Sequence, residues 1–168
     1  MQASRDMCDS SADSRWDTVY IYSKGLAMHI LSADLGFRKA TNDLGVAIHA
    51  AVADGLEELD TFAADETTDG VTEYACIYFF NDSNLLASNT RVHIDSETAH
   101  LGVNFTVGLG TSAINDQEQT INDKNAAPVG VVFSDSPDLA SAINLGDIPA
   151  GQHKSLWVRG VVEPGTLA

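Results

Sequence analysis

The chain has 168 residues, of which 44% are hydrophobic, and a formal net charge of −15, with Asp outnumbering Glu 17 to 7. This length and apolar content predict one folded domain rather than a disordered chain. So negative a charge repels phosphate backbones and excludes nucleic-acid binding as the main role. No stretch approaches the ~18 apolar residues of a membrane span, and the start lacks a signal-peptide core. We therefore expect synthesis in the cytoplasm and no membrane partner.

The chain begins with a predicted arm, which is followed by a predicted hairpin. Residues 1–15 are polar, small and charged, which predicts an N-terminal arm. Two β-prone runs, residues 16–22 and 26–31, flank a Gly-containing turn and predict a hairpin. We expect residues 16–168 to form a single domain, with a divergent N-terminal part at 16–60 and the remainder at 61–168.

Residues 40–60 fit two kinds of element. Apolar residues recur there at spacings of four, four, four and three, which is typical of one helix face; they are Leu44, Ile48, Val52, Leu56 and Leu59. Against a helix, Gly45 and Gly55 interrupt the pattern, and residues 46–49 are equally typical of a strand. One short helix and a strand both remain open.

From Glu73 onward, short apolar runs alternate with turn-forming residues. The runs cover residues 74–80, 90–94, 101–107, 129–133 and 153–162, and Asn, Asp, Gly or Pro bound them. This pattern predicts an all-β fold, an antiparallel β-sandwich of the jelly-roll or immunoglobulin-like kind. Residues 147–152 predict a turn, because Pro149 presets φ and Gly151 can adopt a positive φ.

The longest polar stretch of this region covers residues 113–128. Ile114 and Ile121 are its only large apolar side chains. A connection of that length is usually functional or held in place by a partner.

The sequence has few groupings that could carry chemistry. Gly108-Leu-Gly110-Thr-Ser-Ala113 matches a relaxed dinucleotide fingerprint, but no amphipathic helix follows to hold a pyrophosphate. We therefore interpret it as a glycine-rich strand exit. The five histidines are dispersed without zinc-ligand spacing, and a Gly-x-Ser-x-Gly hydrolase motif is absent. We predict a non-enzymatic protein without catalytic residues, metal ligands or a cofactor.

Aromatic residues mark a candidate assembly interface. Trp16, Tyr20 and Tyr22 share one face of their strand, and Trp157 shares a face of the last run with Arg159. Tyr, Trp and Arg are enriched at protein interfaces, but ordinary core packing explains the same pattern. Cys8 and Cys76 form no disulfide framework, and whether they pair stays open.

Several segments resemble one family, the small β-sandwich virion proteins encoded in the structural gene clusters of tailed phages. The similar segments are Glu73-Tyr-Ala-Cys-Ile-Tyr-Phe-Phe-Asn81, Gly108-Leu-Gly-Thr-Ser-Ala-Ile114, Glu118-Gln-Thr120, Asn125-Ala-Ala-Pro128, Leu145-Gly-Asp-Ile-Pro-Ala-Gly-Gln-His-Lys154 and Leu156-Trp-Val-Arg159. The resemblance covers about residues 57–166. Ala75 and Gly160 stand where the family pattern has arginines, and residues 1–40 lie outside the resemblance.

The resemblance implies a structural role in the virion, with no cofactor. Within that role we expect a capsid decoration or cement protein that stabilises the shell. Its partners would be other virion subunits, the major capsid protein above all, and copies of itself. The alternative is a tail or baseplate component, including an adhesin that binds host glycans.

Overall fold

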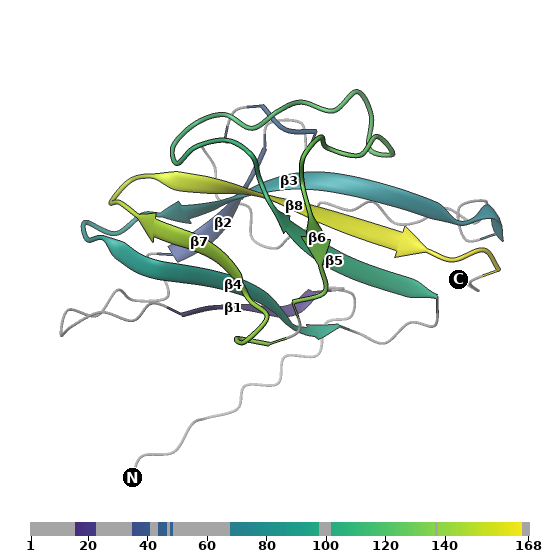
Figure 1. Cartoon of the computed structure of the whole chain (residues 1–168), viewed down its shortest axis with the longest axis horizontal. Helices are drawn as coiled ribbons and strands as arrows, with labels where there is room; N and C mark the ends of the chain where they lie inside the picture. Colours follow the sequence, from purple (N-terminus) through teal and green to yellow (C-terminus); the bar gives the residue numbers. More distant parts are fainter. Residues whose placement is uncertain are drawn as a thin grey trace, which may run out of the picture.

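The computed structural model describes residues 16–22, 35–40, 44–46, 48, 68–97, 102–136 and 138–165. These residues form eight strands: β1 (Trp16–Tyr22), β2 (Leu35–Lys39), β3 (Val71–Asn81), β4 (Ala87–Glu97), β5 (Val103–Leu109), β6 (Phe133–Ser134), β7 (Ile143–Ile148) and β8 (His153–Val162). They make a three-stranded sheet of order β1-β4-β7 and a five-stranded sheet of order β2-β3-β8-β5-β6, both antiparallel (Figure 1). The all-β prediction is therefore confirmed. The described part of the chain contains no helix long and apolar enough to cross a bilayer.

Strands β3 and β8 form the centre of the five-stranded sheet. They pair without interruption from Val71 opposite Val162 to Phe80 opposite His153. Because side chains alternate along a strand, each strand offers two faces. Ile77, Phe79, Leu156 and Val158 belong to a core shared with the three-stranded sheet, whereas Cys76, Tyr78 and Trp157 belong to a second cluster. Trp157 therefore faces away from the core that contains Leu156 and Val158, and we call the face of Cys76, Tyr78 and Trp157 the outer face.

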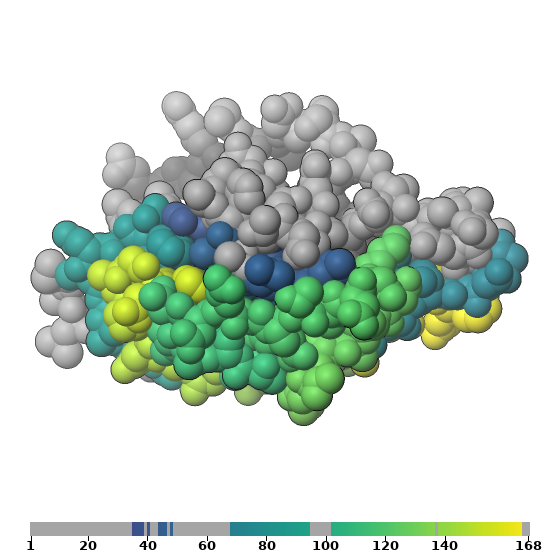
Figure 2. Space-filling view, turned by 90° about the horizontal axis from the view of Figure 1, so that it is seen from above, coloured from purple at the N-terminus to yellow at the C-terminus, as the bar shows by residue number. Residues whose placement is uncertain are grey.

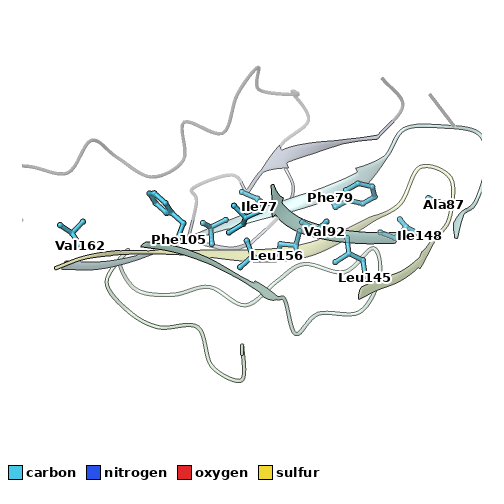
Figure 3. Close-up of a cluster of buried hydrophobic side chains, with 12 residues drawn as sticks. Ile77, Phe79, Ala87, Val92, Phe105, Leu145, Ile148, Leu156 and Val162 are labelled. Atoms are coloured by element: carbon cyan, nitrogen blue, oxygen red, sulfur yellow. The ribbon is translucent and has the colours of Figure 1, made fainter. Parts of the chain in front are cut away.

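The main hydrophobic core draws side chains from both sheets (Figure 3). Its buried members are Ile77, Phe79, Ala87, Val92, Ile94, Phe105, Val107, Leu145, Ile148, Leu156, Val158 and Val162. Burial of a side chain of this kind stabilises a fold by about 1.5–3 kcal/mol, so this cluster is the chief source of stability. The core thereby makes β3, β5 and β8 a firm base for the outer face.

Most predicted strands are confirmed. Residues 16–22, 74–80, 90–94, 101–107 and 153–162 lie in, or largely in, β1, β3, β4, β5 and β8. The turn at 147–152 is also confirmed, since Gly151 has φ 69° and the N–H of Gln152 donates to the carbonyl of Pro149 at 3.1 Å. The N-terminal arm at 1–15, the second half of the hairpin at 26–31, and Cys8 lie outside the described residues.

One predicted strand differs from the structure, and one open alternative is decided by it. Residues 129–133 are not a full strand, because only Phe133 and Ser134 pair with β5, and Val129 and Val132 are 80% and 83% exposed. The choice between helix and strand that stayed open for residues 40–60 goes against the helix at the described residues 44–46 and 48: Ile48 bridges to Ala40, Val46 bridges to Glu118, and Val46 has φ 73°. The remaining positions of that proposed helix face lie outside the described residues.

Truncation of Leu156 tests the shared core. Leu156→Ala removes a fully buried side chain, so we expect the free energy of unfolding to fall by about 3 kcal/mol in urea titrations. Leu86→Ala is the matched control, because Leu86 is 51% exposed, and its effect should stay within about 0.5 kcal/mol. Equal effects of the two variants would contradict the assignment of this core.

Candidate functional site

The outer face of the five-stranded sheet is covered by one long polar connection. We call residues 110–132 the covering loop; it leaves β5, passes above β8 and β3 and returns to β6 (Figure 1). Figure 2 looks onto this side and shows the loop in green beside the blue residues 35–40, 44–46 and 48. Its anchor Ile121 is buried with Tyr78 and Trp157 in the second cluster, and Ala126 and Val131 pack on that cluster. The loop therefore has a small hydrophobic core of its own beneath it.

Two glycines of β5 and its exit allow the loop to approach the sheet. A Cβ on Gly108 would lie 2.5 Å from Cγ1 of Val131, and a Cβ on Gly110 would lie 2.0 Å from Oγ of Ser155. Real Cβ atoms do not come so close to other atoms, so both positions require glycine. The interpretation of this motif as a glycine-rich strand exit fits the structure, and close packing is its physical reason.

The carboxylate of Glu118 occupies the space above Gly110. Its Oε1 accepts hydrogen bonds from the Thr111 hydroxyl at 2.8 Å and the Gln119 N–H at 3.1 Å. Its Oε2 accepts from the Ser112 N–H at 3.1 Å and from the Ser155 hydroxyl. Burial alone would raise the pKa of Glu118, but these hydrogen bonds outweigh it and lower the pKa to about 2. Glu118 is therefore a buried, ionised group whose acceptor sites are all engaged.

Tyr78 joins this network to the neighbouring chain segment. Its hydroxyl accepts a hydrogen bond from the Glu118 N–H at 3.0 Å and donates one to the carbonyl of Val46. Burial raises the pKa of Tyr78 to about 12, so the phenol keeps the proton that it donates. The N–H of Ile121 also donates to the carbonyl of Leu44 at 2.9 Å. Residues 44–48 and the covering loop thus hold each other in place.

Lysines fix the start and the middle of the covering loop. The ammonium of Lys154 donates to the carbonyl of Gly110 at 3.1 Å and to that of Ser112. Burial lowers the pKa of Lys154, and the charge of Glu118 opposes that shift. Further along, Lys124 Nζ lies 2.5 Å from Oε1 of the fully buried Glu73. These contacts connect the loop to β8 and to β3.

The last part of the loop is held by a side-chain amide. The N–H of Val129 donates to Oε1 of Gln119 at 2.8 Å, and Nε2 of Gln119 donates to the Val129 carbonyl at 2.7 Å and to the Thr111 hydroxyl at 3.2 Å. Gln119 therefore pairs with Val129 as a neighbouring strand would. The side chains of Val129 and Val132, which we call the valine tip, point into solvent from this fixed backbone.

The polar groups of this network bond to one another and to the loop backbone. Ser155 is a fully buried hydroxyl next to a carboxylate, but it donates to Glu118 and lies 2.8 Å from Oγ of Ser112, and no substrate can reach it without displacing the loop. In the described ranges, no three His, Cys, Asp or Glu side chains are placed to share a metal ion. The polar groups beneath the loop hold its backbone.

The residues predicted as an assembly interface have different positions. Trp157 is fully buried under the covering loop, which is the core packing considered as the alternative. Arg159 is half-buried, with its guanidinium 5.0 Å from the centre of the Phe133 ring and its Nε donating to Oγ1 of Thr106 at 2.9 Å. Trp16, Tyr20 and Tyr22 lie in β1, where only the backbone is described, so their role at an interface stays a prediction.

Sequence reasoning missed the residues that shape this surface. Glu118 is one of 24 acidic residues, and nothing in its neighbourhood marks it as buried. The run at 129–133 was interpreted as a strand, which hid the exposure of the valine tip. The one available signal was the pair of glycines at 108 and 110, which required something to pack closely against the sheet.

Comparison with known proteins gives no relative. No family model matches the chain, and no curated protein or solved structure matches it.

Protonation of Glu118 is expected to loosen the fold. The pKa of Glu118 falls from 4.5 to about 2 on folding, so its stabilisation of about 3 kcal/mol is present above pH 4.5 and is lost as the pH falls towards 2. Glu118→Gln should therefore lower the free energy of unfolding by about that amount at pH 7, and the difference from the unsubstituted chain should shrink by pH 3.

Urea titrations at pH 7 and pH 3 measure this difference. Asp135→Asn is the control, because it removes the same charge from an exposed side chain. A Glu118→Gln variant as stable as the Asp135→Asn variant at pH 7 would show that the carboxylate does not hold the loop.

Proposed function

We propose that the chain is a non-enzymatic structural protein of a tailed-phage virion, a capsid decoration or cement protein that binds the major capsid protein and stabilises the shell. The observation that carries the proposal is the valine tip. Val129 and Val132 are the most exposed of the large hydrophobic side chains in the described part of the chain. Contiguous exposed apolar surface marks interaction sites, and we propose that these two valines belong to one.

The rigidity of the covering loop favours binding. A loop that becomes ordered only in a complex loses conformational entropy on binding, whereas a loop that is already held avoids that cost. Here Gln119 fixes the tip, and Glu118 and Lys154 fix the start of the loop. The free energy gained when the valine side chains are buried by a partner is then available for affinity.

The virion role follows from the family resemblance together with this surface. We propose that the two sheets form a β-sandwich of the kind the resemblance implies, and the core that they share supports this arrangement. Within the resembling region, Gly108, Gly110, Glu118 and Lys154 all shape the covering loop. Their roles are structural, as a module for assembly requires.

Polar replacement of the valine tip tests the docking surface. We expect Val129→Ser/Val132→Ser to weaken binding to empty capsid shells of the phage that encodes the chain by about tenfold or more, because two apolar contacts are lost. Co-sedimentation with shells over a range of protein concentrations measures the change. Leu86→Ser/Leu139→Ser is the matched control, since both leucines are exposed outside the covering loop. Undiminished binding of the valine variant would exclude this surface.

The number of copies in purified particles distinguishes the shell from the tail. A cement protein should be present in hundreds of copies per particle and should raise the melting temperature of empty shells. A few copies per particle, or binding of the isolated chain to host polysaccharide, would favour the tail or adhesin alternative. Quantified gel bands of purified particles give this number.

Deletion of residues 1–15 tests the predicted arm. If these residues reach across to a neighbouring subunit, the truncated chain should be incorporated less than the full chain in particles assembled from a mixture of the two. Band ratios in those particles measure the competition. Equal incorporation would leave no docking role for residues 1–15.

A further inference from the structure

His153 is a buried histidine beneath the start of the covering loop. It is the first residue of β8 and only 8% exposed. Its ring meets the Tyr78 ring edge-on, with centroids 4.9 Å apart, and lies nearly parallel to the Phe80 ring at 6.4 Å. Its carbonyl accepts a hydrogen bond from the N–H of Asn115 at 2.8 Å. His153 therefore contacts both the sheet and the loop.

The covering loop separates this ring from water. Residues 113–117 are all exposed, and the backbone of Asp116 hydrogen-bonds to the imidazole. This part of the loop is a single layer over the histidine, whereas β3 and β8 on the other side belong to the central sheet. Displacing residues 113–117 would therefore expose the imidazole to water while leaving the central sheet intact.

The charged groups around His153 come from each packed element. Arg38 of β2 lies with its guanidinium 3.6 Å from the centre of the Phe80 ring, and Asp82 lies 3.7 Å from that guanidinium with an exposed side chain. Tyr78 of β3 contributes a neutral phenol, and Asp116 of the loop an exposed carboxylate. On β8 itself, the next residue is the cation Lys154.

We propose that His153 is an acid-sensitive latch: a neutral ring keeps residues 113–117 on the sheet, and a protonated ring releases them. A charged imidazole in this position would be buried beside Arg38, and among the described residues only the exposed Asp116 would offset its charge. Charged groups gain hydration when they reach water, so the protonated ring favours the lifted loop. The latch is a property of the isolated chain and does not depend on the virion role.

The direction of the pKa shift agrees with this geometry. Burial, and then the charge of Arg38, lower the pKa of His153 below its ordinary value of 6.5, although the hydrogen bond to Asp116 and its charge oppose the shift. A histidine with a lowered pKa stabilises the closed form fully above 6.5, and this stabilisation is lost as the pH falls below 6.5. The opening equilibrium should therefore rise by up to about tenfold per pH unit below 6.5.

Hydrogen exchange between pH 8 and pH 5 tests the latch, in a range where Glu118 stays ionised. After correction for intrinsic rates, protection of the Asn115 amide, which donates to the His153 carbonyl, should fall about tenfold, while the Ile77 amide in β3 stays protected. His153→Phe keeps a ring between Tyr78 and Phe80 and should remove this pH dependence. Arg38→Met removes a cation that disfavours the charged ring, so the closed form should tolerate protonation better and the fall in protection should be smaller.

Constant protection of the Asn115 amide from pH 8 to pH 5 in the unsubstituted chain would overturn the proposal without any variant. Unchanged pH dependence in His153→Phe would assign the release to another group and would overturn it as well. Loss of capsid binding by the valine variants bears on the proposed function alone, so the two proposals can fail separately.

Discussion

The carboxylate of Glu118 in the space above Gly110 is the contact on which the outer face depends. It unites donors from three places: the hydroxyl of Ser155 in β8, the start of the loop at Thr111 and Ser112, and its own neighbour Gln119. A buried charge is tolerated only where such donors replace water. Each donor is thereby fixed as well, because withdrawing one leaves an unpaired charge next to the sheet. A polar loop of 23 residues, 110–132, in this way acquires one conformation without regular secondary structure.

The strands could be predicted because their signal is local. Between Leu156 and Val162, β8 has apolar residues on both of its faces. This pattern predicts a central strand between two packed layers. The two strands that were predicted incorrectly have local causes as well. β7 was missed because Gly146, at φ 79°, and Asp147 interrupt its apolar pattern, and the run at 129–133 has strand-forming residues but pairs with β5 only at its end.

The candidate site could not be predicted because its contacts are distant in sequence. Glu118 and Ser155 are 37 residues apart, and Glu118 and Tyr78 are 40 apart. No periodicity links such residues, and a serine or acid in a polar stretch has the same appearance whether it is exposed or buried. Aromatic residues attract attention as interface candidates, yet Trp157 is buried beneath the loop. In the sequence, only the glycines at 108 and 110 indicated that another part of the chain packs closely against the sheet.

The pairing of Gln119 with Val129 has a consequence for how this surface can diversify. A side-chain amide there takes the place of a neighbouring strand, so the geometry of the loop end is set within the loop and not by the register of the sheet. Evolution can therefore exchange residues 129–132 to suit a new target while the strands below stay as they are. The fold in this respect behaves like an antibody framework, in which a constant scaffold carries a variable contact.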